Sequence, residues 1–175
     1  YIYIHMYIYI YKLTTSKEGQ ELIAEVLYDK YRENYEGRKI IYLNTSNGKS
    51  ERYLKFAWLK FSLDGQLLRL LVLKPLEFGN DKALFCGFAD YTCGEGSYGG
   101  GRYLDVTIGK SNKTSLDFNL AYNPYCAYVD KYICPLPPPE NILPISIEAG
   151  ERAYKIEYLT LFNANTLYFC TQLPK

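Results

Sequence analysis

Residues 85–105 read FCGFADYTCGEGSYGGGRYLD, and this stretch decides the fold. Apolar runs at 83–88 and 102–108 flank a glycine-rich loop, which is typical of two strands joined by a long connection. Three glycines in residues 94–99 match the spacing of the dinucleotide-binding fingerprint. That motif must open a helix whose N-terminus holds the pyrophosphate. Because residues 102–108 continue as β, we interpret the match as accidental.

Further strands are expected on both sides of this stretch. Asn47-Gly48 and Asp64-Gly65 stand between apolar runs. Such Asx-Gly pairs favour tight antiparallel hairpins, because both residues tolerate positive φ. The sequence therefore predicts an antiparallel meander. Its expected strands are 39–45, 52–63, 67–73, 83–88, 102–108, 114–121 and 143–148, with 152–158 as a further candidate.

Residues 14–37 predict one helix before the strands. Ser16 suits its N-cap, because the hydroxyl can accept from an unpaired amide of the first turn. Gly37 can end the segment. An apolar stripe at helical spacing lies between them and is expected to pack over the sheet. The stripe is formed by Leu22, Ile23, Val26, Leu27 and Tyr31.

The two ends of the chain are patterned differently from the rest. Residues 1–11 read YIYIHMYIYIY. This alternation suits a strand, but an alternating purine–pyrimidine DNA repeat encodes the same residues. We interpret residues 1–13 as a non-native or disordered leader and residues 159–175 as a weakly patterned tail. Between them the sequence predicts a mainly β domain over 38–158, antiparallel and either barrel-like or a sandwich, with one N-terminal helix.

Composition limits the classes of function. The net charge is +1, from 20 basic and 19 acidic residues, and no basic stripe points to nucleic acid. The 20 tyrosines favour half-buried β surfaces. No apolar run approaches the roughly 20 residues of a membrane helix, and no secretory signal is visible, so the cytoplasm is the default expectation. The only histidine, His5, lies in the leader, which disfavours Ser-His-Asp and Cys-His catalysis.

Arg102 follows three glycines, Gly99, Gly100 and Gly101, at the end of the loop. Glycine lets backbone approach a ligand closely, and arginine can hold a carboxylate or phosphate in a bidentate fork. The alternative is a tight loop in which Arg102 pairs with a structural carboxylate such as Asp90. The sequence leaves both interpretations open.

Further polar side chains follow this loop along the chain. Carboxylates paired in a pocket can act as general acid and base. Buried Asn and Glu side chains can equally bond loop amides that have no ladder partner. The sequence does not decide between these roles. The candidates are Asp117, Asn119, Asn123, Glu140, Asn141 and Glu151.

Cys126 and Cys134 bracket the segment AYVDKYI. They are either buried thiols, a disulfide across a short hairpin, or reactive or metal-binding groups. The last alternative is the least favoured, because there is no C-x-x-C pair and structural zinc needs four N or S ligands. We predict no metal and no cofactor; a flavin-binding split barrel rests on fold-level analogy alone.

Four segments in order resemble the signatures of the domain of unknown function 1684 family. The resemblance covers residues 40–156 and implies a mostly bacterial, β-rich protein with no established activity, cofactor or substrate. Cys86 and Cys93 stand where the family has other residues, so neither is a good catalytic candidate. The matching segments are FADYTCG at 88–94 with SYGGGRY at 97–103, LDFNLAYNPYCAY at 116–128, CPLPPPEN at 134–141 and IEAGE at 147–151.

Two functions remain open from the sequence. The first is a pocket for a small polar or anionic ligand, with Arg102 and the glycine backbone holding the anion and carboxylate-dependent hydrolysis as the reaction if there is one. The second is a non-enzymatic structural or protein-interaction module, in which the same polar residues fix long loops and the tyrosines face the partner. Convergence of the polar residues on one cavity would favour the first.

Overall fold

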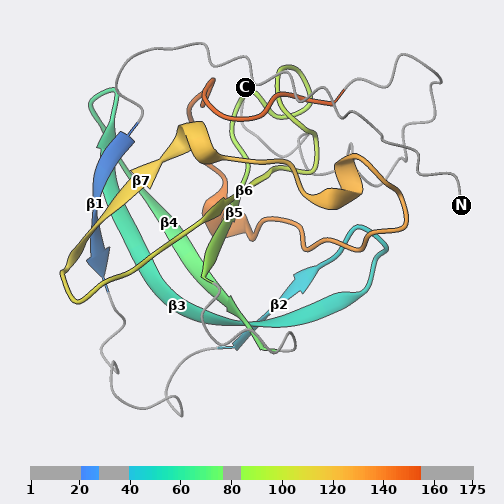
Figure 1. The fold of residues 1–175 in the computed structure, drawn as a ribbon, viewed down its shortest axis with the longest axis horizontal. Helices are drawn as coiled ribbons and strands as arrows, with labels where there is room; N and C mark the ends of the chain where they lie inside the picture. The colour runs from blue at the N-terminus through green and yellow to red at the C-terminus, as the bar shows by residue number, and fades with distance from the viewer. Residues whose placement is uncertain (1–20, 28–39, 77–83, 155–175) are drawn as a thin grey trace, which may run out of the picture.

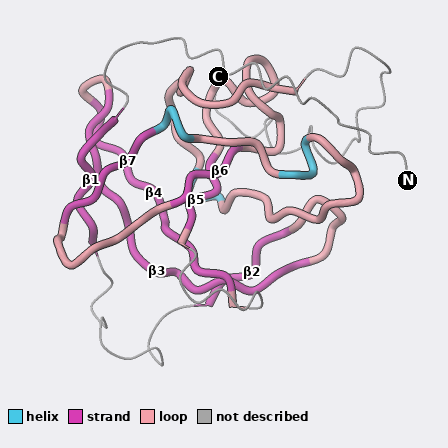
Figure 2. Tube along the Cα trace, viewed as in Figure 1, coloured by secondary structure: helices cyan, strands magenta, loops and turns pink. Residues whose placement is uncertain are grey.

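The computed structural model describes residues 21–27, 40–76 and 84–154. In these residues the chain forms one sheet of seven strands, all of whose pairs are antiparallel, and short 3₁₀ helices (Figures 1 and 2). The strands are β1 Glu21–Leu27, β2 Ile40–Asn44, β3 Ser50–Leu63, β4 Gln66–Pro75, β5 Phe85–Phe88, β6 Arg102–Asp105 and β7 Lys113–Asp117. The 3₁₀ helices are η2 Phe118–Leu120, η3 Tyr125–Ala127 and η4 Pro139–Asn141.

The sheet is an antiparallel half-barrel in the order β6-β5-β4-β3-β1-β7. The 14-residue β3 curves beneath the other elements and pairs with β2 through its first part and β1 through its last part (Figure 1). Its register with β4 shifts between Lys55 and Ala57. A bulge of this kind bends a strand and increases its twist, so it lets one long strand serve both ends of the sheet.

The hairpin that joins β3 to β4 confirms the predicted Asp64-Gly65 turn. Leu63 pairs with Gln66, so only two residues form the turn. Asp64 has φ 49° and Gly65 has φ 75°. Positive φ at both central residues is what a type I′ turn requires, and its twist matches that of the flanking strands.

Both faces of β4 are buried over residues 70–74, between β5 and β3. Leu70 and Val72 belong to the main core inside the half-barrel, whereas Leu71 and Leu73 belong to a smaller cluster with Leu43 and Tyr53. Loops after β7 lie across the open side of the half-barrel (yellow to orange in Figure 1). Their buried side chains complete the main core, and these are Phe118, Ala121, Leu143, Ile145, Ile147 and Ala149.

The predicted N-terminal helix is wrong for residues 21–27, which form β1 between β3 and β7. Ala24 and Val26 are buried, whereas Ile23 is 67% exposed, so burial alternates with period two. The apolar residues fit helical spacing as well, but pairing on both sides satisfies the amides of β1 and tertiary context overrides local propensity. The other residues of the predicted helix lie outside the described part.

The predicted strand 114–121 ends early, at Asp117. The Asp117 carboxylate accepts from the Asn119 amide at 3.0 Å and from Asn119 Nδ2 at 2.8 Å. This local hydrogen bonding ends β7 and starts the 3₁₀ helix η2. Leu120 is consequently 62% exposed and does not share the core face with Leu116 and Phe118.

The predicted strand 143–148 is wrong, because these residues form no strand, although their burial alternates as it would in one. Pro144 has no N–H to donate to a ladder. The segment bonds residues 89–91 only at separate points, with Leu143 N donating to Ala89 O at 2.8 Å and Ile145 O accepting from Tyr91 N at 2.9 Å. Residues 152–154 are also not in a strand. Residues 155–158, the leader and the tail lie outside the described part.

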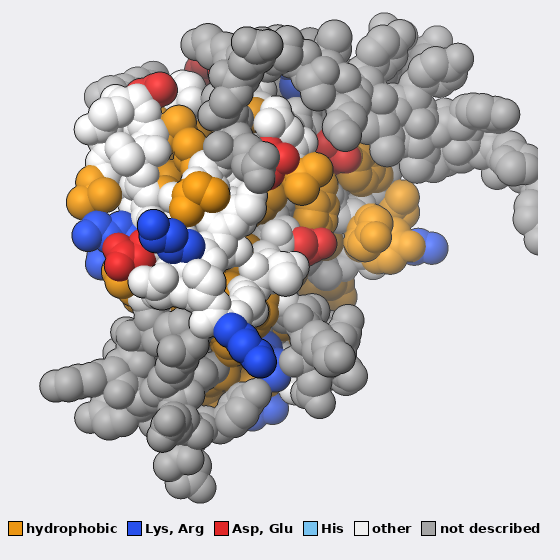
Figure 3. All heavy atoms as spheres, turned by 60° about the vertical axis from the view of Figure 1, so that its left-hand side comes forward, with side chains coloured by type: hydrophobic (Ala, Val, Ile, Leu, Met, Phe, Trp, Pro, Cys, Tyr) orange, Lys and Arg blue, Asp and Glu red, His pale blue; other side chains and the backbone are white. Residues whose placement is uncertain are grey.

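The surface of the described residues is mixed in charge. Basic side chains on the described part of the face in Figure 3 are interspersed with apolar and acidic ones. Within the described ranges, no helix is long and apolar enough to cross a membrane.

Two neighbouring substitutions distinguish the strand from a helix at residues 21–27. Ala24→Asp places a charge at a fully buried position and should lower the free energy of unfolding by more than about 3 kcal/mol. Ile23→Asp places the same charge at an exposed position and should change it by less than about 0.5 kcal/mol. Urea denaturation of both variants measures this. If these residues formed an amphipathic helix that buried Ile23, Ile23→Asp would also lower the free energy of unfolding strongly.

Candidate functional site

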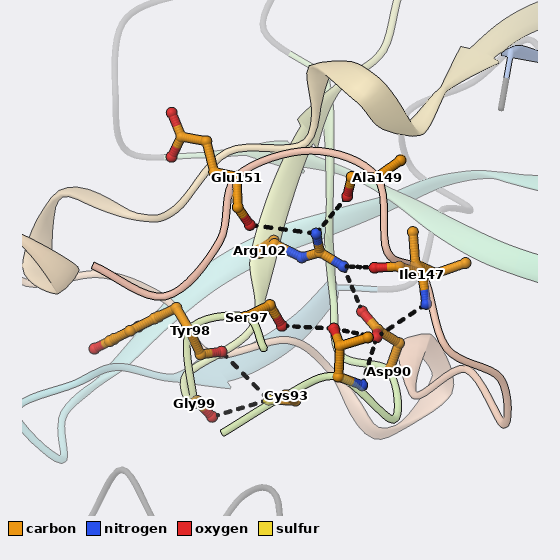
Figure 4. Close-up of polar contacts among 10 residues, drawn as sticks. Asp90, Cys93, Ser97, Tyr98, Gly99, Arg102, Ile147, Ala149 and Glu151 are labelled. Carbon is orange, nitrogen blue, oxygen red and sulfur yellow. Dashed lines mark hydrogen bonds and ion pairs between the residues drawn. The ribbon is translucent and has the colours of Figure 1, made fainter. Parts of the chain in front are cut away.

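Arg102, the first residue of β6, is a buried charged side chain, with 2% of it exposed. Its Nη2 donates to Asp90 Oδ2 and to Ile147 O, both at 2.7 Å. Its Nη1 donates to Ala149 O at 2.6 Å and lies 3.4 Å from Glu151 O (Figure 4). The guanidinium therefore holds the backbone of residues 147–151 against the sheet.

Asp90 uses both carboxylate oxygens in the same network. While Oδ2 accepts from Arg102, Oδ1 accepts from Thr92 N at 2.8 Å, Thr92 Oγ1 at 2.6 Å and Ile147 N at 3.2 Å. Asp90 is 1% exposed. Of the two interpretations of Arg102, the structure shows the pairing with Asp90, so neither Nη1 nor Nη2 is free to hold an anion.

The glycines before Arg102 permit close packing within the protein. Gly101 has φ +83°, and a Cβ there would lie 2.6 Å from Phe88 O and 2.5 Å from Pro137 Cγ. A Cβ on Gly100 would lie 2.5 Å from the Tyr98 ring. The carbonyl of Gly99 lies 3.2 Å from Cys93 Sγ. These contacts within the protein explain why glycines stand here, and the explanation needs no bound molecule.

Glu151 and Asn123 extend the network around Arg102. Glu151 Oε2 accepts from Asn123 N at 2.7 Å and from Tyr128 Oη at 2.5 Å. Asn123 Nδ2 donates to Arg152 O at 2.8 Å. Asn123 is buried, and its Oδ1 has no hydrogen-bond partner. These two predicted site residues thus lie in one cluster with Arg102 and Asp90.

Asn141 is a separate structural link. Its Oδ1 accepts from Leu71 N at 2.6 Å, and its Nδ2 donates to Leu71 O at 2.9 Å and to Gly87 O at 2.8 Å. The side chain is fully buried. It therefore pins η4 to β4 and β5, and its polar atoms are occupied.

The remaining candidates do not join the Arg102 cluster either. Glu140 forms an ion pair with Lys55, and the hydrogen bond from Lys55 lowers the pKa of Glu140. Asp117 and Asn119 bond each other at the start of η2. The predicted site residues thus divide into separate groups.

One cavity of about 260 Å³ lies beside the Arg102 cluster. Three carboxylates and two guanidinium groups line it, from Glu95, Glu148, Glu151, Arg102 and Arg152. Uncharged polar residues complete much of the wall, namely Tyr91, Thr92, Ser97 and Ser146. Glu95 and Arg152 were not predicted as site residues. In the sequence, Glu95 is marked only by a glycine on either side, and Arg152 only by its position directly after Glu151.

Cys126 and Cys134 are free thiols, so the disulfide that their spacing allowed is not present in the structure. Cys134 is 7% exposed and Cys126 is half-buried. Cys126 N instead donates to Cys134 Sγ at 3.3 Å. Among the described residues, no group of three or more His, Cys, Asp or Glu side chains is placed to hold a metal ion.

The half-barrel sheet and the buried arginine define a β domain whose long loops are held by a polar network. The chain belongs to the DUF1684 family of proteins of unknown function, whose profile matches residues 24–152. This confirms the resemblance of the four signature segments. An uncharacterised protein of Haloarcula marismortui, solved by solution NMR, is 36% identical with a TM-score of 0.60, over 76% of this chain and 70% of that one. No curated protein matches.

Replacement of Asp90 tests how much the Arg102–Asp90 ion pair contributes to the stability of the fold. Asp90→Ala leaves the buried guanidinium without its counter-charge and should lower the free energy of unfolding by about 3–5 kcal/mol. Glu140→Gln breaks the partly exposed pair with Lys55 and should cost less than about 1 kcal/mol. Urea denaturation at pH 7 measures both.

The same pair of variants differs in pH dependence. The pKa of Glu140 is lowered in the folded protein, so its contribution is fully present above the pKa of the unfolded chain and is lost as pH falls through the folded value. The small cost of Glu140→Gln should therefore vanish at acid pH. An equal cost for Asp90→Ala and Glu140→Gln would contradict a buried, dominant Arg102–Asp90 pair.

Gly101→Ala tests whether close packing explains the glycine run. Gly65→Ala is the matched control, since Gly65 has φ +75° and open space around its Cβ position. The control should cost about 1–2 kcal/mol from backbone strain alone. Gly101→Ala should cost about 1–3 kcal/mol more, because Phe88 O and Pro137 must move. Similar midpoints in thermal unfolding of the two variants would refute this explanation.

Proposed function

We propose that the cavity beside Arg102 binds a small polar ligand. The observation that carries this proposal is a buried hydrogen-bond donor without a partner. Arg102 lines the cavity, and its Nε is buried without a hydrogen-bond partner although the rest of the guanidinium is fully bonded. An unpaired buried N–H is costly, and an acceptor atom of a bound molecule would satisfy it.

The charges around the cavity select the chemical class of ligand. Asp90 already neutralises Arg102. Of the charged groups that remain on the wall, Glu95, Glu148 and Glu151 outnumber Arg152. The balance is therefore acidic, which favours a ligand with an amino group and an acceptor oxygen over a simple anion. Pockets for drug-sized ligands span roughly 300–1,000 Å³, so about 260 Å³ suits a smaller molecule.

The proposal includes no hydrolysis step. A carboxylate pair acts as acid and base when one member is held protonated and the other ionised. Glu151 Oε2 accepts hydrogen bonds from Asn123 N and Tyr128 Oη, so the fold already engages this oxygen. No described carboxylate of the cavity is shown to be its acid partner.

An exposed aromatic surface favours a second candidate function, a protein-interaction module. Tyr125 and Tyr132 are 71% and 44% exposed, and their ring centroids lie 5.4 Å apart. Ile133 beside them is 51% exposed. Tyrosine is enriched at protein interfaces because it combines a large apolar ring with a polar tip.

A thermal-shift screen of amino acids, amino sugars and polyamines tests the ligand site. A ligand at 100 times its Kd stabilises the folded state by about 2.7 kcal/mol, which raises the melting temperature measurably. The stabilisation should be lost in Glu148→Gln and in Arg152→Gln, whose exposed side chains line the cavity. These variants keep the Arg102–Asp90 pair, so they should fold.

Asp130→Asn is the control, because Asp130 is exposed and does not line the cavity. This variant should keep the full shift with the same compound. The ligand proposal fails if no compound stabilises the wild-type protein, or if every hit stabilises the cavity variants as much as the control. In that event the interaction module becomes the better explanation.

A further inference from the structure

A second group of reactive side chains lies away from the cavity, around Cys126 and Cys134. Cys126 is in η3, and Cys134 follows the turn after it. The first is half-buried, whereas the second is 7% exposed. Neither residue lines the cavity beside Arg102, so the group is independent of the proposed ligand site.

Backbone contacts hold the two cysteines together. Cys126 N donates to Cys134 Sγ at 3.3 Å, which places the second sulfur against the backbone of the first residue. Ser46 fixes the other side of Cys134. Its Oγ accepts from Cys134 N at 3.2 Å, and its N donates to Cys134 O at 2.9 Å. Ser46, in the turn after β2, and the backbone of Cys126, in η3, thus fix the position of Cys134.

The side chains around Cys126 suit a thiolate. Hydrogen bonds from Cys134, Tyr98 and Ser46 to the sulfur outweigh burial and lower the pKa of Cys126 to about 7. The Tyr98 hydroxyl lies 3.9 Å from Cys126 Sγ. The pKa of the Cys134 thiol is raised, because it donates its proton to Cys126 and is partly buried. Of the two sulfurs, Cys126 is therefore the one that ionises first.

The other titratable groups near the pair do not oppose this arrangement. Tyr103 is buried, and its pKa is raised well above the usual value, so it stays neutral. The pKa of Tyr98 is also raised, mainly by burial, so its hydroxyl keeps the proton that it donates. Asp130 is exposed and acts on Tyr98 only as a distant charge.

We propose that Cys126 is a nucleophilic thiol that reduces hydroperoxides, with Cys134 as the resolving thiol. The geometry that carries this inference is a half-buried cysteine whose backbone N–H lies 3.3 Å from the sulfur of a second, buried cysteine, which Ser46 also holds in place. Thiolates attack peroxides, whereas thiols do not. A resolving cysteine must lie close to the oxidised one, and Cys134 Sγ lies against the backbone of Cys126.

The reaction balances in two steps. Cys126 thiolate attacks the terminal oxygen of a hydroperoxide, the O–O bond breaks, and the products are Cys126 sulfenic acid and an alkoxide that takes a proton to become an alcohol. Cys134 sulfur then attacks the Cys126 sulfur, forming a disulfide, and hydroxide leaves with the Cys134 proton as water. The dithiol loses two electrons and the peroxide gains them.

Peptide mapping of the full chain after treatment with hydrogen peroxide tests the proposal. Trypsin cleaves after Lys131, between the two cysteines, so a disulfide joins two peptides that are otherwise separate. The expected product is this linked pair, lighter than its separate components by two hydrogen atoms. In Cys134→Ala the linkage is impossible, and dimedone should instead trap a sulfenic acid at Cys126.

The pH profile of alkylation separates a reactive thiol from a merely accessible one. With limiting iodoacetamide, the rate at Cys126 should have its midpoint near pH 7. In Cys134→Ala and in Tyr98→Phe the midpoint should move toward the ordinary thiol value of about 8.5. Cys86 is the internal control, because it is fully buried and its pKa is raised, so it should stay unmodified.

Tyr98→Phe keeps the test decisive if Cys134→Ala does not fold, since it removes only a hydroxyl and leaves both cysteines. Three results would overturn the proposal. They are a Cys126 that hydrogen peroxide leaves unmodified, a Cys126 that is oxidised without linkage to Cys134, and a rate midpoint that Tyr98→Phe leaves unchanged. Linkage between two copies of the chain would also exclude Cys134 as the internal resolving thiol.

Discussion

The buried pair of Arg102 and Asp90 is the constraint on which the loops of this domain depend. Moving two ions from water into the interior costs several kcal/mol each, and their mutual attraction and hydrogen bonds must offset that cost. Here Nη1 and Nη2 bond Asp90 and the carbonyls of Ile147 and Ala149. Because Ile147 and Ala149 do not lie in a strand, this arginine supplies to their carbonyls the donors that a neighbouring strand would otherwise supply.

The sheet was largely predictable because its signals are local. Asp64-Gly65 defines a turn from two residues alone, and the apolar runs on either side define β3 and β4. Residues 21–27 were not predictable, because their apolar residues fit both a helix and a strand. What decides between them is pairing with β3 and β7, whose positions no local pattern contains.

Contacts between distant parts of the chain also limited the prediction of the candidate site. The sequence identified Arg102, Asp90, Asn123 and Glu151, and the structure brings these four into one network. It could not show that Asn141 bonds Leu71 and Gly87 at a distance from that network, since those contacts depend on how the loop crosses the sheet. Residue type alone does not separate a side chain that faces a cavity from one that bonds backbone.

The position of β1 in the sheet bears on how the chain folds. The β3–β4 hairpin closes through two residues, so it can form early and at low entropic cost. β1 instead joins the β3 edge to β7 and sets Leu22 beside Leu116, which lies far along the sequence. Completion of the half-barrel thus waits until β7 has been synthesised, and until then the partly folded chain exposes the unpaired edge of β1 to other chains.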